Sequence, residues 1–212
     1  MIAHSVNALR QWGGCDRIVC STDDDSIAAA ALAAGADVPW TRPEELAGGD
    51  VGKIAVLRHA LLECERERSL TYDAIVDVDV TAPLRTVDDI AATVALLEGE
   101  TSNALTVTPA RKNPYFNMVE LEPDGWARLA KPRATAVAGR QTAPTVYELN
   151  ASVYTYTRGF LLDATTVIGP RTRVHVMPHE RSVDIDTPLD LLLIEAILDA
   201  GLATLPPALP RA

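Results

Sequence analysis

Two pairs of aspartates are the residues whose types and spacing best suit chemistry. Asp77 and Asp79 lie within the apolar run AIVDVDV, and Asp184 and Asp186 lie in the sequence VDIDTP. Aspartates two residues apart on an extended chain point to the same side, so their carboxylates repel each other unless a cation lies between them. Carboxylate oxygens suit Mg²⁺, which commonly binds through a few carboxylates plus the phosphates of a substrate. The Asp184–Asp186 pair therefore predicts a Mg²⁺–nucleotide site.

Other interpretations compete for the Asp184–Asp186 pair. In a purely structural one, Asp186 caps the helix that follows Thr187-Pro188, and Asp184 pairs with Arg181. A sugar-nucleotide glycosyltransferase, which also uses an Asp-x-Asp metal site, is a further hypothesis for either acidic pair. The spacing alone leaves these alternatives open.

Asp77 and Asp79 admit a different chemistry. The sequence IVDVDVT matches the Asp-x-Asp-x-Thr/Val signature of haloacid-dehalogenase-type phosphatases, in which the first Asp is a phosphorylated nucleophile and the second a general acid. That signature normally follows the first strand of its domain, whereas two strand–helix units precede it here. Such phosphatases also need a downstream Lys and an acidic pair, and Lys53, Lys112 and Lys131 do not follow obvious strand ends. The phosphatase is therefore the less favoured hypothesis.

The composition limits the possible partners. The chain has 29 Asp and Glu against 19 Lys and Arg, with a formal net charge of −10, which argues against binding a nucleic acid polymer. No apolar run reaches membrane-spanning length, and the opening MIAHSVNALRQW lacks the features of a signal peptide. Cys15, Cys20 and Cys64 have no metal-ligand spacing and are expected to be reduced thiols. We therefore expect a cytoplasmic protein with no membrane partner.

The elements that must position the aspartates alternate along the first half of the chain. Helical spacing with Gly stops, and β-branched runs, predict in order a helix over 2–12, a strand over 16–22, helices over 23–34 and 53–68, a strand over 74–80, a helix over 86–97 and a strand over 103–110. This alternation predicts an α/β fold with a mostly parallel sheet and helices on both faces.

The alternation of helices and strands ends after residue 110. Residues 111–145 are rich in Pro, Arg and Gly, which predicts an inserted arm. Strands over 146–157 and 172–177 and a helix over 189–200 are expected to follow, with a loose tail over 201–212. We expect a single domain over 1–200.

The predicted topology places both aspartate pairs at one edge of the sheet. In open parallel sheets, ligands bind at the carboxyl ends of the strands. Residues 79–85 follow the strand that contains Asp77, and residues 182–190 follow the strand at 172–177. Asp79, Asp184 and Asp186 are therefore expected to share one site.

Six segments, in the same order, resemble one family, the acylneuraminate cytidylyltransferases or CMP-sialic acid synthetases. They are DRIVCSTDDDSIA, RPEELAGGDVGKIAVLRHAL, DVTAPLRTVDDI, RKNPYFNMVE, GRQTAPTVYELNASVYTYTR and MPHERSVDIDTPLDLLLIE. Together they cover nearly the whole chain, from its first residue to about residue 200. The segments DVTAPLR and NASVY most resemble those of bacterial members that activate sialic acid or the related nine-carbon acids legionaminate and pseudaminate.

The resemblance implies a Rossmann-like nucleotidyltransferase core and a reaction. CMP would pass from CTP to the anomeric hydroxyl of a nine-carbon 2-keto sugar acid, with release of pyrophosphate. In-line attack on the α-phosphorus needs positioning and charge neutralisation more than covalent catalysis. Mg²⁺ on Asp184 and Asp186 is expected to bridge phosphate and sugar oxygens.

The resemblance also implies roles for individual residues. Arg140 is expected to take part in catalysis with the two metal-binding aspartates, and Arg42 to bind the nucleotide. The residues expected to bind the sugar substrate are Asp79, Thr81, Arg85, Gln141, Asn150 and Tyr154. Asp77 is expected to be structural and bonded to neighbouring backbone.

Two further expectations concern the arm and the N-terminus. In the family the arm mediates dimers, so a homodimer is expected. Family members open with a strand and an Arg-x-Gly-Ser-Lys loop that wraps the CTP phosphates, whereas IAHSVNAL corresponds to the helix after that loop. Either the active protein is longer, or the chain is a non-catalytic remnant that binds a sugar or a partner subunit. Smaller departures are Gly49 for Asp, Asp79 for Gln and Ala82 for Ser.

Overall fold

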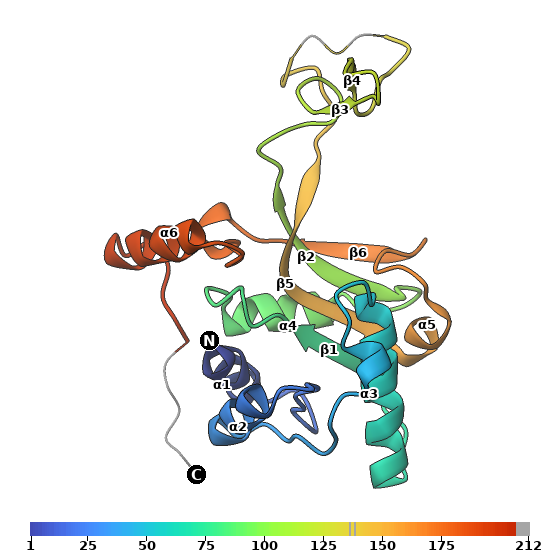
Figure 1. Cartoon of the computed structure of the whole chain (residues 1–212), viewed down its shortest axis with the longest axis vertical. Helices are drawn as coiled ribbons and strands as arrows, with labels where there is room; N and C mark the ends of the chain where they lie inside the picture. The colour runs from blue at the N-terminus through green and yellow to red at the C-terminus, as the bar shows by residue number, and fades with distance from the viewer. Residues whose placement is uncertain (136, 138, 207–212) are drawn as a thin grey trace.

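The computed structural model of the chain describes residues 1–135, 137 and 139–206. Its main sheet has the strand order β1-β5-β2-β6 (Figure 1). The strands are β1 (Ala74–Val78), β2 (Asn103–Pro109), β5 (Tyr147–Thr157) and β6 (Thr172–Val176). A second sheet is formed by two short strands of the arm, β3 (Val119–Leu121) and β4 (Ala127–Leu129).

The expectation of a mostly parallel sheet was wrong, because the sheet is mixed. β5 is antiparallel to both of its neighbours, β1 and β2, and only β2 and β6 form a parallel pair. The arm is the physical reason: β2 leads out into the arm, and β5 returns from it beside β2, so the two must run in opposite directions. β1, β2 and β6 still point the same way, so their carboxyl ends share one edge.

Helices cover both faces of the sheet, as predicted (Figure 1). On one face, α3 (Lys53–Arg68) and α5 (Arg158–Asp163) pack on Leu105 and Tyr154. On the other face, α1 (Ile2–Trp12) and α4 (Val87–Ala95) pack on Val153. Val153 and Tyr154 are neighbours on β5, so the alternation of side chains along the strand supplies both cores.

Local signals set the helix boundaries. In α2 (Asp25–Ala34), the Asp24 carboxylate accepts hydrogen bonds from the first-turn N–H groups, and Gly35 ends the helix with a left-handed φ of 92°. The apolar face of α3 is buried at Ile54, Leu57 and Leu61, as its spacing predicts. The remaining elements are the short 3₁₀ turns η1 (Glu44–Leu46) and η2 (His179–Arg181) and the helix α6 (Pro188–Asp199).

The predicted strand over 16–22 is not formed. This segment makes only two isolated bridges, Val19 with Asp37 and Thr22 with Thr41. A cavity of about 430 Å³ is lined both by residues of this segment, such as Ile18 and Val19, and by β1. A strand is stabilised by hydrogen bonding along its length, and here the cavity lies where a pairing strand would be needed.

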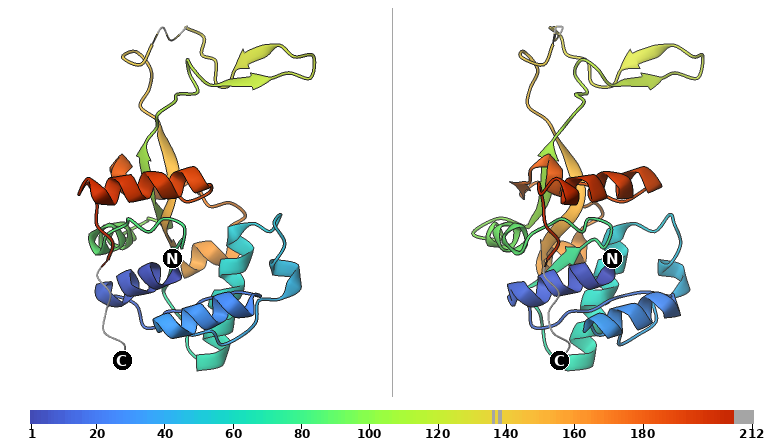
Figure 2. Two further views of the ribbon diagram at one scale, coloured as in Figure 1. Left: turned by 60° about the vertical axis from the view of Figure 1, so that its left-hand side comes forward. Right: turned by 90° about the vertical axis from the view of Figure 1, so that its left-hand side faces the viewer.

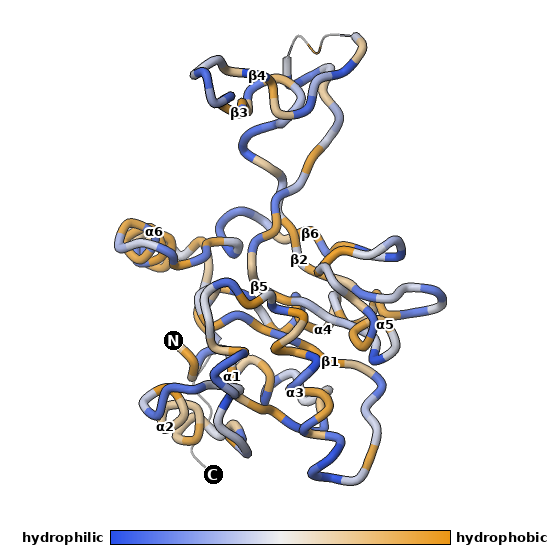
Figure 3. The backbone as a smooth tube through the Cα atoms, turned by 45° about the vertical axis from the view of Figure 1, so that its right-hand side comes forward, coloured by the Kyte–Doolittle hydropathy of each residue, from blue (hydrophilic) through white to orange (hydrophobic). Residues whose placement is uncertain are grey.

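The arm leaves the carboxyl edge of the sheet and projects away from the body (Figures 1 and 2). α6 lies near its base, and many of its residues are hydrophobic (Figure 3), with Leu189 and Leu192 exposed. Within the described part of the chain, no helix combines the length and apolar character needed to cross a bilayer. Half of the expected loose tail, residues 207–212, lies outside the described residues, and residues 201–206 form no helix or strand.

Candidate functional site

The segment that carries Asp184 and Asp186 lies against the carboxyl end of β1. The Ile185 N–H donates to the Thr81 carbonyl at 2.9 Å. The Ile185 side chain packs in the core with Leu84 and Ile194. This contact brings the second aspartate pair to the residues that follow Asp79, as the topology argument predicted.

The purely structural explanation of the Asp184–Asp186 pair was wrong on both counts. Arg181 binds Asp89 instead of Asp184, with Nη2 2.9 Å from Oδ1. α6 is capped by Thr187, whose N–H and hydroxyl donate to the Asp190 carboxylate at 2.8 and 2.7 Å. Asp186 contributes only its backbone N–H to that cap.

Asp184 has the property expected of a cation ligand. Its Oδ1 atom is buried, and no hydrogen bond reaches it from the described residues. A buried carboxylate oxygen without a partner is costly, and a bound cation would relieve that cost. Asp184 also acts electrostatically on Arg85 and Tyr154, so it faces the same site. The described residues contain no group of three or more His, Cys, Asp or Glu side chains that could hold a metal, so a cation here would need further ligands from the substrate.

Lys53 joins the first aspartate pair to the site. Its Nζ lies 2.7 Å from Asp77 Oδ2, 2.8 Å from Asp79 Oδ2 and 4.2 Å from the centroid of the Tyr154 ring. Burial alone would lower the pKa of Lys53, but the two carboxylates outweigh it and raise the pKa above its usual value. Burial and Asp77 raise the pKa of Asp79, which Lys53 partly offsets. The partner of Asp77 is thus a side chain, and the expected backbone bonding was wrong.

Arg85 is fully buried, with 1% of its surface exposed. Its Nε donates to Ser152 Oγ at 3.1 Å, its Nη1 donates to Ser5 Oγ at 2.9 Å, and its Nη2 donates to the Asp79 carbonyl. Burial lowers the pKa of Arg85 to about 10, so the group stays charged at neutral pH. Arg85 therefore holds the backbone at the end of β1 in place through buried hydrogen bonds. Its predicted contact with the substrate stays a prediction.

A distortion of β5 places two more polar groups at this edge. The register of β2 against β5 shifts between Leu105 and Val107, and Ala151 has a positive φ of 46°. Such bulges re-aim side chains, often beside functional sites. Here the neighbouring Asn150 donates to Ser182 Oγ at 2.9 Å, and its buried Oδ1 takes no hydrogen bond from the described residues. Asn150 thus presents a second unpaired acceptor near the aspartate segment.

Arg42 and Thr81 lie at two different parts of the molecule. Arg42 lines the cavity beside β1 and donates to the Ser21 hydroxyl at 3.3 Å and to the Ser21 carbonyl. Thr81 contacts the aspartate segment through its carbonyl oxygen. The predicted nucleotide role of Arg42 is not tested by these contacts.

Arg140 and Gln141 are exposed residues of the arm. Arg140 Nη2 donates to the Arg111 carbonyl at 3.1 Å, which keeps it within the arm. The arm projects away from the sheet (Figure 2), and no contact between these two residues and Asp79 is found in the described part of the chain. Their predicted roles stay predictions.

The sequence interpretation missed Lys53, Asp89 and Arg181. Lys53 begins α3, where the helix dipole disfavours a cation, so its position was a signal that an acidic partner lies nearby. Asp89 was interpreted only as a favourable first-turn charge. Nothing local points from Asp89 to Arg181, which lies 92 residues along the chain.

The charges at the site suit a divalent cation bound together with a phosphate ester. Asp77, Asp79, Asp184 and Asp186 are four carboxylates, against the two cations Lys53 and Arg85, which leaves two negative charges in excess. Lys53 pairs with Asp77 and Asp79 and offsets one of their two charges, whereas the described residues form no ion pair with Asp184 or Asp186, so these two carboxylates are the ones available to a metal. Such an arrangement can position a nucleotide and neutralise its phosphates.

Comparison with known proteins finds relatives over most of the length of the chain. It is 36% identical to post-translational flagellin modification protein B of Campylobacter coli and 37% identical to the CMP-N,N'-diacetyllegionaminic acid synthase of Campylobacter jejuni. Each alignment spans 199 residues, which is 93% of this chain and 83% of the relative. The corresponding synthase of Legionella pneumophila is 27% identical over 94% of the chain. No family model matches the chain.

The fold is similar to that of solved nucleotidyltransferases. The structure of CMP:2-keto-3-deoxy-manno-octonic acid synthetase in complex with CTP matches with a TM-score of 0.65 at 14% identity, covering 94% of this chain and 88% of that one. This likeness shows an α/β nucleotidyltransferase fold. With the sequence similarity to relatives above 35% identity, it leads to one conclusion: the chain belongs to the acylneuraminate cytidylyltransferase family.

Proposed function

We propose that the protein transfers CMP from CTP to the anomeric hydroxyl of a nine-carbon 2-keto sugar acid of the legionaminic type and releases pyrophosphate. The relatives named for CMP-N,N'-diacetyllegionaminic acid synthesis support this choice of acid over sialic or pseudaminic acid, because the pseudaminic acid cytidylyltransferase of Campylobacter jejuni is only 22% identical. The proposal covers one domain over residues 1–200 that acts in the cytoplasm.

One observation carries the proposal from the structure. The hydrogen bond from Ile185 to Thr81 holds Asp184 and Asp186 at the same sheet edge as Asp79, with Asp184 Oδ1 unpaired. Mg²⁺ bound there would neutralise phosphate charge and polarise the attacking hydroxyl. Asp184 and Asp186 are its proposed ligands.

The chain's own residues do the positioning. Lys53 offsets the charge of Asp77 and Asp79, so an anionic substrate can approach Asp79 without meeting two uncompensated carboxylates. Arg85 fixes the backbone at Asp79 through its buried hydrogen bonds. The unpaired Oδ1 of Asn150 accepts a hydrogen bond from a substrate hydroxyl. Because in-line transfer depends on alignment, this rigidity contributes to the rate.

We also propose that the protein is a homodimer and that the arm forms the contact. Its hairpin exposes Leu121 and Trp126, 75% and 73% accessible, and an isolated two-stranded hairpin is marginally stable in water. A partner that covers this hairpin would stabilise it. The proposed roles of Arg140 and Gln141 in gripping sugar and phosphate would then depend on the assembled dimer.

The test is incubation of the purified protein with CTP, Mg²⁺ and one sugar acid at a time. N,N'-diacetyllegionaminic, pseudaminic and N-acetylneuraminic acids form the panel, and mass spectrometry detects the CMP-sugar. We expect the legionaminic product to form fastest and EDTA to abolish it. Preference for another acid would contradict the substrate assignment. Failure of all three, with no CTP binding seen by calorimetry, would favour the non-catalytic remnant.

A further inference from the structure

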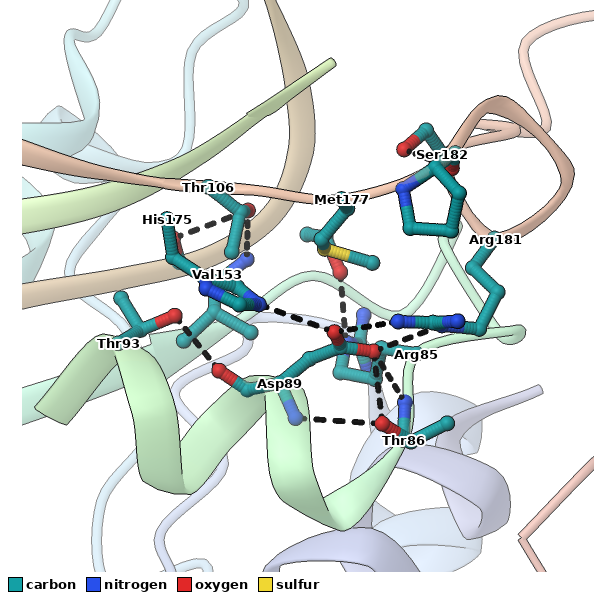
Figure 4. A network of polar contacts seen from close by, with 12 residues as sticks. Arg85, Thr86, Asp89, Thr93, Thr106, Val153, His175, Met177, Arg181 and Ser182 are labelled. Carbon is teal, nitrogen blue, oxygen red and sulfur yellow. Dashed lines mark hydrogen bonds and ion pairs between the residues drawn. The ribbon is translucent and has the colours of Figure 1, made fainter.

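Asp89 is a buried carboxylate that is contacted by residues of three elements, the N-terminus of α4, β6 and η2. It is only 2% exposed and lies in the first turn of α4. The Thr86 N–H and hydroxyl donate to Oδ2 at 2.9 and 2.8 Å, and His175 Nε2 of β6 lies 3.1 Å from Oδ1. Arg181 approaches both oxygens, with Nε 3.1 Å from Oδ2 and Nη2 2.9 Å from Oδ1 (Figure 4). A two-pronged contact of this kind fixes both distance and orientation.

The capping of α4 does not explain why Arg181 binds Asp89. Thr86 and Asp89 form a complete reciprocal capping box, which satisfies the start of the helix without any arginine. Arg181 instead lies at the end of η2, three residues before Asp184. The contact therefore serves the segment that follows Arg181.

Residues 182–187 are held in position by hydrogen bonds and by the ion pair of the preceding Arg181. Between η2 and α6, residues 182–187 belong to no strand or helix. The segment is held at Arg181 by Asp89, at Ser182 by Asn150 and the Pro178 carbonyl, and at Ile185 by Thr81. Asp184 lies between these anchors, so the position of its carboxylate follows from theirs.

From these contacts we infer that Asp89 and Arg181 are positioning residues that hold Asp184 and Asp186 in the geometry needed to bind a divalent cation. The inference rests on the proposed function, which makes that pair the metal ligands. Two like-charged ligands converge only if the backbone between them is held, and outer partners of metal ligands commonly alter metal affinity by about 10–100-fold. Arg181 is thus part of the metal site although it never touches the metal.

The experiment measures Mn²⁺ binding to the full chain by electron paramagnetic resonance, with Mn²⁺ as the probe and CTP present to supply the phosphate ligands that two carboxylates lack. The signal of Mn²⁺ and CTP without protein is the reference. Arg181→Met removes the fork, Arg181→Lys keeps the charge with a single donor group, and Asp89→Asn removes the negative charge at similar size. Arg171→Met is the matched control, because the Arg171 side chain makes a long, exposed pair with Glu100 at 3.7 Å and no other ion pair with the described residues. Thermal unfolding and circular dichroism show which variants are folded.

We expect Arg181→Met and Asp89→Asn to weaken Mn²⁺ binding by about 10-fold or more, Arg181→Lys to fall between them and wild type, and Arg171→Met to match wild type. Asp186→Asn separates the two proposals. If it abolishes Mn²⁺ binding while folded Arg181→Met and Arg181→Lys bind like wild type, the inference is overturned and the metal site stands. If Asp186→Asn binds like wild type, or wild type binds no more Mn²⁺ than CTP alone does, the proposed metal site fails and the inference fails with it.

Discussion

The ammonium of Lys53 lies 2.8 Å from the carboxylate of Asp79 and bridges it to Asp77 on the same strand end. The bridge joins the start of α3 to the carboxyl edge of the sheet. It also explains how two aspartates are tolerated in the strand pattern AIVDVDV, because one cation pairs with both carboxylates and reduces their mutual repulsion. The phosphatase hypothesis requires a lysine that follows the aspartates in the sequence. The lysine that contacts them, Lys53, precedes them.

Replacing Lys53 tests this bridge. Lys53→Met leaves Asp77 and Asp79 close together without a cation, so we expect the free energy of unfolding at pH 7 to fall by about 1–3 kcal/mol. The loss should shrink towards pH 4.5, because removing the ammonium raises the pKa of Asp79 further and the folded state then gains stability on taking up a proton. Urea denaturation at both pH values measures this. Lys112→Met, in the exposed arm, is the control, and an equal loss at both pH values would argue against the bridge.

The buried Asp89 predicts an acid-dependent loss of stability. Burial opposes its ionisation, but hydrogen bonds from Arg181 and Thr86 outweigh burial and lower the pKa from 3.8 to about 2. The ionised form is therefore favoured in the folded state, and its contribution of about 2 kcal/mol is present above pH 4 and disappears as the pH falls towards 2.

Stability curves of wild type and Asp89→Asn check this. The free energies of unfolding should differ most near pH 6 and converge between pH 4 and pH 2. Asp88→Asn, an exposed neighbour on the same helix turn, should leave the curve nearly unchanged. A difference between wild type and Asp89→Asn that is constant from pH 6 to pH 2 is inconsistent with the lowered pKa.

The positive φ of Ala151 predicts that glycine is favoured there. A left-handed conformation costs an alanine about 1–2 kcal/mol, and the greater freedom of an unfolded glycine recovers only part of this. Ala151→Gly should therefore raise the free energy of unfolding by about 0.5–1 kcal/mol. The same substitution at Ala104, in regular β2, should lower it. Destabilisation at both positions would show that the bulge is not strained.

The exposed hairpin predicts the oligomeric state. Leu121→Asp places a charge at the proposed dimer contact, so analytical ultracentrifugation should show a dimer for wild type and a monomer for the variant. Leu62→Asp puts the same charge on an exposed site of α3, outside the arm, and should remain dimeric. A wild-type monomer, or a dimer that survives Leu121→Asp, would contradict the proposed contact.

Much of the fold could be predicted because its signals are local. The bounds of α3, Lys53–Arg68, follow from apolar spacing, and those of α2 from Asp24 and Gly35. The direction of β5 could not be predicted in this way, because it depends on how the arm returns to the sheet. The segment over 16–22 has strand composition, yet composition does not supply a pairing partner.

The site was predicted in part for the same reason. Asp79, Asp184 and Asp186 could be placed at one edge because each lies beyond a strand that its composition predicts, and the carboxyl ends of parallel strands share an edge. The pairs Lys53–Asp77 and Asp89–Arg181 join residues 24 and 92 positions apart, and a single sequence carries no signal of such separation. Arg140 and Gln141 were grouped with this site by resemblance, whereas their position in three dimensions depends on the arm and on what covers it.

The most direct test of the account is the rate of Mg²⁺-dependent pyrophosphate release from CTP and N,N'-diacetyllegionaminic acid in wild type and Asp184→Asn. Asparagine keeps the size of the side chain but removes the charge of the unpaired buried oxygen. We expect the rate to fall at least about 100-fold with the melting temperature almost unchanged, while Asp199→Asn, an exposed carboxylate on α6, retains the wild-type rate. An Asp184→Asn protein that keeps more than about a tenth of the wild-type rate would contradict the assignment of Asp184 as a metal ligand.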